Sequence, residues 1–170
     1  MLLRHLASIL ALPVIVILVI PFLLVSLFPF VLLWGVHYNT AIALFIVAKF
    51  FIGLGSILLF STISLFVKKG EGTIAPWKPA RKLIITGFYS HVRNPMHIGV
   101  FLILTGESIM SGSISLIIWT SLFVIGNLIY VPAIEEKKLA ERYGDVYMIY
   151  KRSVPRWIPR ASSWKPKTQT

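Results

Sequence analysis

The chain contains no cysteine and few acidic residues. Its 170 residues include 6 Asp and Glu against 17 Lys and Arg, and only 14% of them are charged. The absence of cysteine excludes disulfides, thiolate nucleophiles, cysteine-ligated zinc and iron–sulfur clusters. A soluble domain usually carries about 25% charged residues. The low charge, together with a hydrophobic content of 56%, therefore predicts an integral membrane protein with no sizeable soluble domain.

Four long apolar runs predict transmembrane helices. The first, residues 6–36, is too long for the apolar part of a signal peptide, so we expect it to be retained. Its three prolines, and a length that exceeds the ~30 Å apolar core of a bilayer, predict one kinked span or, alternatively, two short ones. The other runs are 41–67, 96–110 and 114–131, the last two joined as an antiparallel hairpin by Ser111-Gly112-Ser113. We predict an all-α protein with four transmembrane helices, or five if the first run is split.

The positions of the basic residues predict the topology. Apart from Lys49, they fall at Arg4, in residues 68–94 and in residues 137–167. The positive-inside rule places these segments on the cytoplasmic side. The basicity thus reflects topology, and we expect contacts with membrane lipids and no nucleic-acid partner. The predicted organisation is a single domain with N-terminal transmembrane helices over 1–67, a cytoplasmic loop over 68–94, and a helical hairpin with a cytoplasmic tail over 95–170.

Asn94-Pro95 marks the expected start of the third span. Asn is a strong N-cap, and Pro suits the first position of a helix. The free N–H groups and the positive dipole end of such a helix attract anions, and Arg93 and His97 lie on either side of this start. The sequence therefore predicts either an anion-binding helix start or, more simply, a capped helix with an interfacial arginine.

A pair of carboxylates, Glu135-Glu136, is expected at the same cytoplasmic mouth. An antiparallel hairpin that turns at Gly112 brings the end of the fourth span beside the start of the third, and the two glutamates follow one turn later, after an expected kink near Pro132. The pair could serve a ligand, or it could form salt bridges with nearby cations of the same segment: Lys137, Lys138 or Arg142.

A C-terminal amphipathic helix is expected after the glutamates. Leu139, Tyr143, Tyr147 and Tyr150 recur at helical spacing with charged residues on the other faces, as in helices that lie at the membrane surface. The following segment, 154–159, contains Trp157 between prolines. Aromatic residues at this level anchor a chain at the interface or stack on a ligand.

Four further features have mainly structural interpretations. Lys49 and Glu107 are ionisable residues within spans, and we predict that they form a buried pair. Gly53-x-Gly55 lacks the rest of a dinucleotide fingerprint and is interpreted as close helix packing, as are Gly99 and Gly106. The four histidines show no metal-ligand spacing, and we predict no metal site.

The motifs at the cytoplasmic mouth resemble those of a known enzyme family. In order, they are Leu83-Ile84-Ile85-Thr86-Gly87-Phe88-Tyr89, Arg93-Asn94-Pro95-Met96-His97-Ile98-Gly99, Glu135-Glu136, Tyr143-Gly144 with Tyr147 and Tyr150, and Val154-Pro155-Arg156-Trp157-Ile158-Pro159. Over residues 70–160 the chain resembles the isoprenylcysteine carboxyl methyltransferase family, which is related to the phospholipid N-methyltransferases.

The resemblance implies an S-adenosylmethionine pocket at the cytoplasmic face, with a lipophilic acceptor that enters from the bilayer. Arg93, Pro95 and Gly99 match the family motif, whereas Asn94 and His97 stand where the family has His and Tyr. The residues with implied catalytic roles are Arg93, His97 and Glu136. Those with implied roles in cofactor binding are Asn94, Pro95, Gly99, Glu135, Glu136, Tyr147 and Trp157.

The expected activity is methyl transfer to a lipophilic acceptor, foremost a carboxylate. A carboxylate is already ionised, so positioning and desolvation would carry the catalysis, while an amine would need His97 or a glutamate as a base. Two alternatives stay open at this point. One is an NADPH-dependent reductase of the sterol reductase type, with Arg152 or Arg156 on the 2′-phosphate, and the other is a non-catalytic adaptor that binds anionic lipids.

Overall fold

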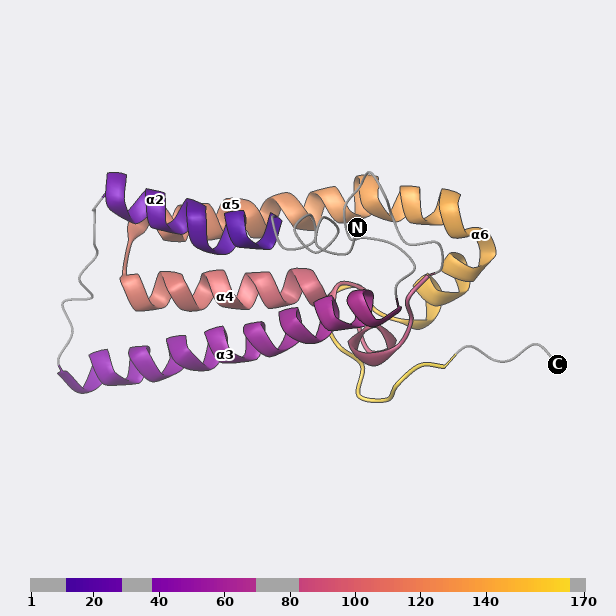
Figure 1. The fold of residues 1–170 in the computed structure, drawn as a ribbon, viewed down its shortest axis with the longest axis horizontal. Helices are drawn as coiled ribbons and strands as arrows, with labels where there is room; N and C mark the ends of the chain where they lie inside the picture. Colours follow the sequence, from indigo (N-terminus) through magenta and orange to yellow (C-terminus); the bar gives the residue numbers. More distant parts are fainter. Residues whose placement is uncertain (1–11, 29–37, 70–82, 166–170) are drawn as a thin grey trace.

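The computed structural model describes residues 12–28, 38–69 and 83–165, and in these ranges it contains helices and no strand (Figure 1). The helical elements in chain order are η1 (Ile15–Val19), α2 (Ile20–Leu27), α3 (Tyr38–Lys69), η2 (Gly87–Ser90), α4 (Pro95–Ser111), α5 (Ile114–Tyr130), η3 (Val131–Glu135) and α6 (Glu136–Ser153). The prediction of an all-α fold is confirmed for this part of the chain.

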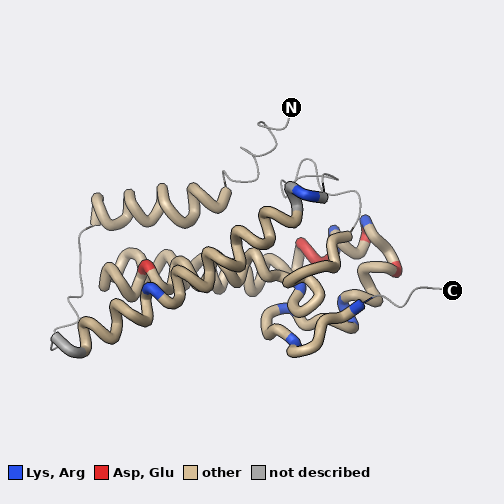
Figure 2. The backbone as a smooth tube through the Cα atoms, turned by 60° about the horizontal axis from the view of Figure 1, so that its bottom comes forward, with Lys and Arg blue, Asp and Glu red and all other residues tan. Residues whose placement is uncertain are grey.

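Helices α2, α3, α4 and α5 lie side by side along one axis, and α6 extends beyond one end of this bundle (Figure 1). Within the described ranges, Lys49 and Glu107 are the charged residues in the half of the bundle away from α6, and the rest gather toward the end that holds α6 (Figure 2). A core of aliphatic side chains from η1, α3 and α4 joins the helices: Ile17, Leu59, Ile63, Val100, Ile103 and Leu104.

Glycines allow α3 and α4 to pack backbone against backbone. A Cβ added at Gly55 would lie 2.6 Å from the carbonyl oxygen of Gly99, and one added at Gly106 would lie 2.7 Å from that of Ala48. Real Cβ atoms do not approach this closely, so only glycine fits at these positions. The packing interpretation is confirmed for Gly55, Gly99 and Gly106. It is wrong for Gly53, which has nothing within 4 Å of an added Cβ.

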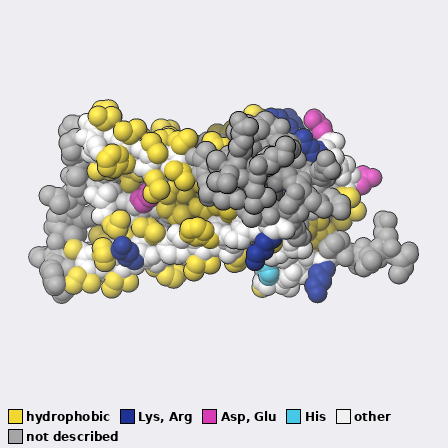
Figure 3. Space-filling model, in the orientation of Figure 1, with side chains coloured by type: hydrophobic (Ala, Val, Ile, Leu, Met, Phe, Trp, Pro, Cys, Tyr) yellow, Lys and Arg dark blue, Asp and Glu magenta, His cyan; other side chains and the backbone are white. Residues whose placement is uncertain are grey.

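The surface of the bundle is strongly apolar, as a membrane protein requires. Large hydrophobic side chains such as Phe22, Phe50 and Phe60 are more than 60% exposed, and Figure 3 shows hydrophobic groups over most of the bundle. Two continuous helical stretches are long and apolar enough to cross a membrane, Thr40–Leu65 and Ile114–Ser153, while Leu12–Leu27 and Pro95–Ser111 are shorter apolar helices. The membrane character is supported, and the number of spans stays a prediction.

Proline shapes two helices without breaking them. Before Pro21 the helix widens into the π turn η1, and around Pro132 it widens into the π turn η3. A π turn accommodates a residue that lacks an N–H donor and clashes with the preceding turn. The kink expected near Pro132 thus takes the form of one wide turn, and the chain bends instead at Gly144, whose φ of 53° suits glycine. The first helix ends at Leu27; the rest of the first apolar run lies outside the described residues.

The C-terminal segment folds back over the loop that precedes α4. Backbone hydrogen bonds join the two segments at Arg93 N to Pro155 O (2.9 Å), Arg160 N to His91 O (3.0 Å) and Trp164 N to Ser90 O (3.0 Å). Beneath them, Tyr147, Tyr150 and Val154 form a second small core. The hydroxyl of Tyr150 donates to the carbonyl of Tyr89 (2.7 Å). This crossing places the C-terminal segment directly beside the start of α4.

The predicted pair between Lys49 and Glu107 is wrong. No ion pair joins them, although both residues are described. The ammonium of Lys49 is exposed and stands 5.3 Å from the centre of the Phe45 ring. Oε2 of Glu107 is enclosed and makes no hydrogen bond to the described part of the chain.

Candidate functional site

Glu136 is the centre of an ionic cluster at the end of the bundle that holds α6. Its carboxylate is 3% exposed and contacts three cations. Oε1 accepts from Nη1 of Arg93 at 2.8 Å and from Nε of Arg156 at 2.5 Å. Oε2 accepts from Nη2 of Arg156 at 3.0 Å and lies 3.0 Å from Nζ of Lys151. Both oxygens are therefore occupied, and the cluster joins α4, α6 and the C-terminal segment.

The cluster holds Glu136 ionised and leaves an excess of positive charge. Burial by itself would raise the pKa of Glu136, but hydrogen bonds from Arg156 and Lys151 and the charge of Arg93 outweigh it, so the pKa lies below its ordinary value. Arg93, Lys151 and Arg156 surround Glu136, and even with the neighbouring Glu135 ionised they leave a local surplus of one positive charge. An anionic group that approaches this end of the bundle is therefore favoured over a cation.

Arg93 has a buried donor without a partner among the described residues. Its side chain is 9% exposed, its Nη1 binds Glu136, and the hydroxyl of Tyr147 lies 3.5 Å from the same nitrogen. The Nε–H of Arg93 is enclosed and has no hydrogen-bond partner in the described part of the chain. A buried guanidinium donor is costly to leave unpaired, so an acceptor from a ligand would satisfy it.

Glu135 and His97 form the more open side of the site. Oε2 of Glu135 lies 4.0 Å from Nε2 of His97, and the two side chains are 33% and 26% exposed. Burial, together with the charge of Glu136, raises the pKa of Glu135 above its ordinary value. Unlike Glu136, Glu135 keeps oxygens available for the donors of a ligand.

Aromatic rings line the wall next to His97. Trp157 stacks in a tilted geometry on Phe101, with ring centres 5.5 Å apart, and packs edge-on against His97 at 6.3 Å. Phe101 in turn contacts Phe123 of α5 at 6.0 Å. Trp157 is thus held over the start of α4 by its ring contacts. Trp157 therefore borders the site beside His97, a position that suits either interfacial anchoring or stacking on a ligand.

The remaining predicted residues occupy supporting positions. Asn94 precedes α4 as expected, but its side chain caps no helical N–H and donates instead to the carbonyl of Arg156 at 3.2 Å. The N-cap prediction is therefore wrong for this side chain, because the C-terminal segment lies beside the start of α4 and orients the amide toward its own carbonyl. Pro95 is buried at the first position of α4, and Gly99 faces Gly55 of α3.

The sequence missed Lys151 and the role of Arg156. The cations expected to pair with the glutamates, Lys137 and Lys138 among them, are not partners of Glu136. Arg156, considered for a nucleotide phosphate, is committed to Glu136. Helical spacing could have identified Lys151, which lies four residues after Tyr147 on the same face. No described group of three or more His, Cys, Asp or Glu residues is placed to hold a metal ion.

Comparisons with known proteins agree with this geometry. A sequence model of the phospholipid methyltransferase family matches residues 40–146, well over half of the chain. A methanethiol S-methyltransferase of Crocosphaera subtropica (strain ATCC 51142 / BH68) is 35% identical over 72 residues, which cover 42% of this chain and 27% of that protein. The match thus spans about a quarter of the length of this curated relative. No solved structure matches the chain. Because the family match includes α3, α4, α5 and both glutamates, the chain belongs to the phospholipid methyltransferase family.

Proposed function

We propose that this protein is a membrane methyltransferase that uses S-adenosylmethionine and methylates a lipophilic acceptor at the cytoplasmic end of the bundle. The observation that carries the proposal is the buried Nε–H of Arg93, which lacks a partner among the described residues, at the end of the bundle where Glu135 and Trp157 flank His97. These groups complement the carboxylate, the ammonium and hydroxyl groups, and the aromatic base of this cofactor.

Each part of the site has a proposed task. Arg93 and the start of α4 bind the carboxylate of the cofactor, since an arginine and free helical N–H groups attract anions. Glu135 accepts hydrogen bonds from its ammonium or hydroxyl groups. Trp157, Phe101 and His97 offer ring faces and edges for the base and the sulfonium. When bound, S-adenosylmethionine supplies a methyl group activated by its positive sulfur.

Glu136 is proposed to act by positioning. Both of its oxygens are occupied by cations, so it holds Arg93 and Arg156 in place rather than meeting a ligand. The same arrangement is supported by Tyr147, whose hydroxyl contacts Arg93, and by Asn94, which binds the carbonyl of Arg156. Pro95 is buried at the start of α4, and Gly99 allows α3 to pack closely. The precision of the site therefore depends on residues that touch no ligand themselves.

The acceptor is proposed to react as an anion, foremost as a carboxylate. The surplus of positive charge around Glu136 favours an anionic nucleophile over a protonated amine. A carboxylate needs no base, whereas for a thiol or an amine His97 lies at the open side of the site to accept a proton. The name of the relative from Crocosphaera adds a thiol as a second acceptor to be tested.

Calorimetric titration of the detergent-purified protein with S-adenosylhomocysteine tests the cofactor. We expect saturable binding that falls about tenfold in Arg93→Lys, which keeps the charge but loses the Nε–H donor. Glu135→Gln should also weaken binding, while the matched control Glu141→Gln, on an exposed part of α6, should not. Binding of NADPH alone would favour a reductase, and binding of neither by a folded sample would favour an adaptor.

A methyl-transfer assay then compares three acceptors of similar apolar size. An N-acetyl-S-prenylcysteine offers a carboxylate without a free amine, a long-chain thiol offers sulfur, and phosphatidylethanolamine offers an amine. We expect the carboxylate to be methylated fastest. A faster reaction of the thiol would replace the carboxylate in the proposal, and a preference for the amine would contradict the electrostatic argument.

A further inference from the structure

Two opposite charges in the apolar part of the bundle lack ionic partners among the described residues. Lys49 of α3 is exposed, and its ammonium lies over the face of Phe45. Glu107 of α4 is half-buried, and its enclosed oxygen has no partner among the residues that the structure describes. Charged residues between apolar stretches of a membrane helix are rare and are usually paired. Something outside the described chain is therefore expected to pair with each.

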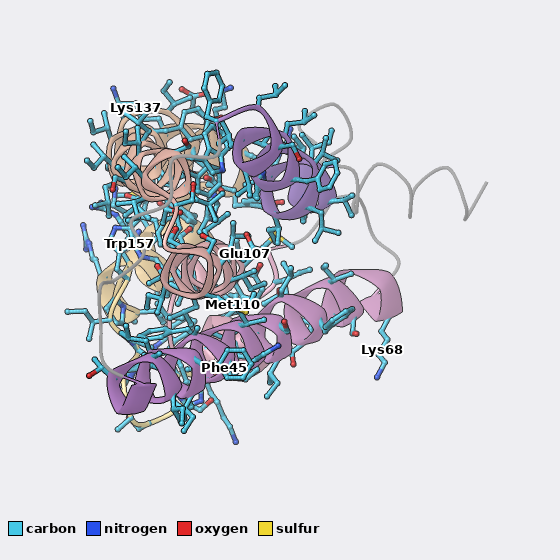
Figure 4. All side chains as sticks on the ribbon, turned by 90° about the vertical axis from the view of Figure 1, so that its left-hand side faces the viewer. Phe45, Lys68, Glu107, Met110, Lys137 and Trp157 are labelled. Carbon is cyan, nitrogen blue, oxygen red and sulfur yellow. The ribbon has the colours of Figure 1, made fainter. Side chains whose placement is uncertain are left out.

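The two charges lie at nearly the same depth. Gly106 packs directly on the backbone of Ala48, so these two residues lie at the same depth along the bundle. Glu107 and Lys49 are the next residues of their helices. Because the helices are antiparallel and rise by 1.5 Å per residue, the two Cα atoms differ in depth by only about 3 Å. Figure 4 shows Glu107 on α4 above Phe45 on α3 in the view along the bundle.

Both charges also belong to the same side of the molecule. Lys49 and Glu107 each follow the contact residue of their helix by one position, and in antiparallel helices this turns both side chains to the same side. In Figure 3 the acidic and the basic group of the apolar half appear on one face, surrounded by hydrophobic side chains. The face thus carries a positive and a negative group side by side.

A small residue on this face leaves room for another helix. Phe45, Lys49 and Gly53 follow one another at intervals of four on α3 and form one stripe. Gly53 is exposed, and an added Cβ would meet nothing within 4 Å. Membrane helices associate through small residues that let backbones approach and through polar groups that pair across the contact. The exposed Gly53, one turn from Lys49, is therefore suited to close contact with a helix of another molecule.

We propose that this face is the interface of a homodimer, in which Lys49 of each copy pairs with Glu107 of the other. Two copies with the same orientation in one membrane are related by a two-fold axis along the membrane normal, which preserves depth. Reciprocal pairs then require that the lysine and the glutamate lie at equal depth on one face, as they do here. The inference does not depend on the proposed enzymatic function.

Energy transfer between donor-labelled and acceptor-labelled protein in lipid vesicles tests the dimer. We expect transfer above the level for random mixing in the wild type, and self-association weakened about tenfold in Lys49→Glu and in Glu107→Lys, each of which brings like charges together. When the two single variants are mixed, each mixed dimer has one native pair and one pair of reversed sign, and the transfer should recover. Circular dichroism shows whether each variant is folded.

The mixture distinguishes a dimer from a pair within one chain. A pair within the chain would be restored in the double variant K49E/E107K but not in the mixture of single variants. A steric test adds an independent measurement: Gly53→Leu should weaken association, while Gly126→Leu, at an equally open glycine of α5, should not. A wild type without energy transfer, or a mixture of folded variants without recovery, would overturn the proposal.

Discussion

Replacing Glu136 by Gln should destabilise the protein substantially, because it removes the one carboxylate that three cations share. Loss of one partner from a buried ion pair costs roughly 3–5 kcal/mol, since the remaining charge stays buried without compensation. The guanidinium of Arg93 is in this position, with 9% of its side chain exposed. Arg156 and Lys151 are 32% and 37% exposed and can turn toward water. We therefore expect about 3 kcal/mol, the lower end of the range.

The assay is unfolding in mixed micelles with increasing denaturing detergent, followed by circular dichroism. Glu135→Gln is the matched control. The carboxylate of Glu135 is one-third exposed, and its ionic partner among the described residues is His97 at 4.0 Å. This substitution should cost less than about 1 kcal/mol. The double variant Arg93→Gln/Glu136→Gln should lose less stability than the two single losses added together, since it removes the unpaired charge as well.

Two results would refute this reasoning. A Glu136→Gln variant as stable as the wild type would show that the cluster does not support the fold. An equal loss in Glu135→Gln would show that the two carboxylates are equivalent, contrary to their different burial and partners.

The remaining predictions concern pH, helix packing and the C-terminal crossing. The pKa of Glu136 is lowered in the folded state. Its contribution to the free energy of unfolding is therefore fully present above the pKa of unfolded Glu, near 4.3, and is lost as the pH falls through the pKa of the folded state. The stability of the wild type should consequently fall more steeply with acid than that of Glu136→Gln. Gly99→Ala should cost about 1–3 kcal/mol in the same unfolding assay, because a Cβ there would lie 2.9 Å from a backbone oxygen, whereas Gly53→Ala should change stability by less than about 0.5 kcal/mol. Tyr150→Phe removes the hydrogen bond to Tyr89 and should cost about 1 kcal/mol, with faster hydrogen exchange in the C-terminal segment as its local signature; unchanged exchange would contradict this role.

Several features could be predicted from local sequence because they depend on local physics. Apolar runs of sufficient length form helices in a membrane whatever their neighbours are. The proline after Asn94 marked the start of α4, and Gly112 marked the turn of the hairpin. The hairpin in turn brought Arg93 to the same end as Glu135 and Glu136, because two antiparallel helices share their ends.

Other features depended on contacts between distant segments. Spacing along a helix gives the depth of a residue but does not decide whether two side chains meet, and Lys49 and Glu107 lie level without pairing. The pairing of Glu136 with Arg156 could not be predicted from local sequence, because it depends on the crossing of the C-terminal segment over the start of α4. For the same reason, the amide of Asn94 donates to the carbonyl of Arg156 instead of accepting from a helical N–H.

The sequence by itself thus determined the membrane environment, the helices and the end of the bundle at which the charged motifs meet, since these follow from composition and periodicity. Only the tertiary structure decided that Glu136 is enclosed by cations while Glu135 stays open beside His97 and Trp157. That division of roles depends on which side chains are desolvated together, and desolvation is a property of the packed molecule rather than of any single segment.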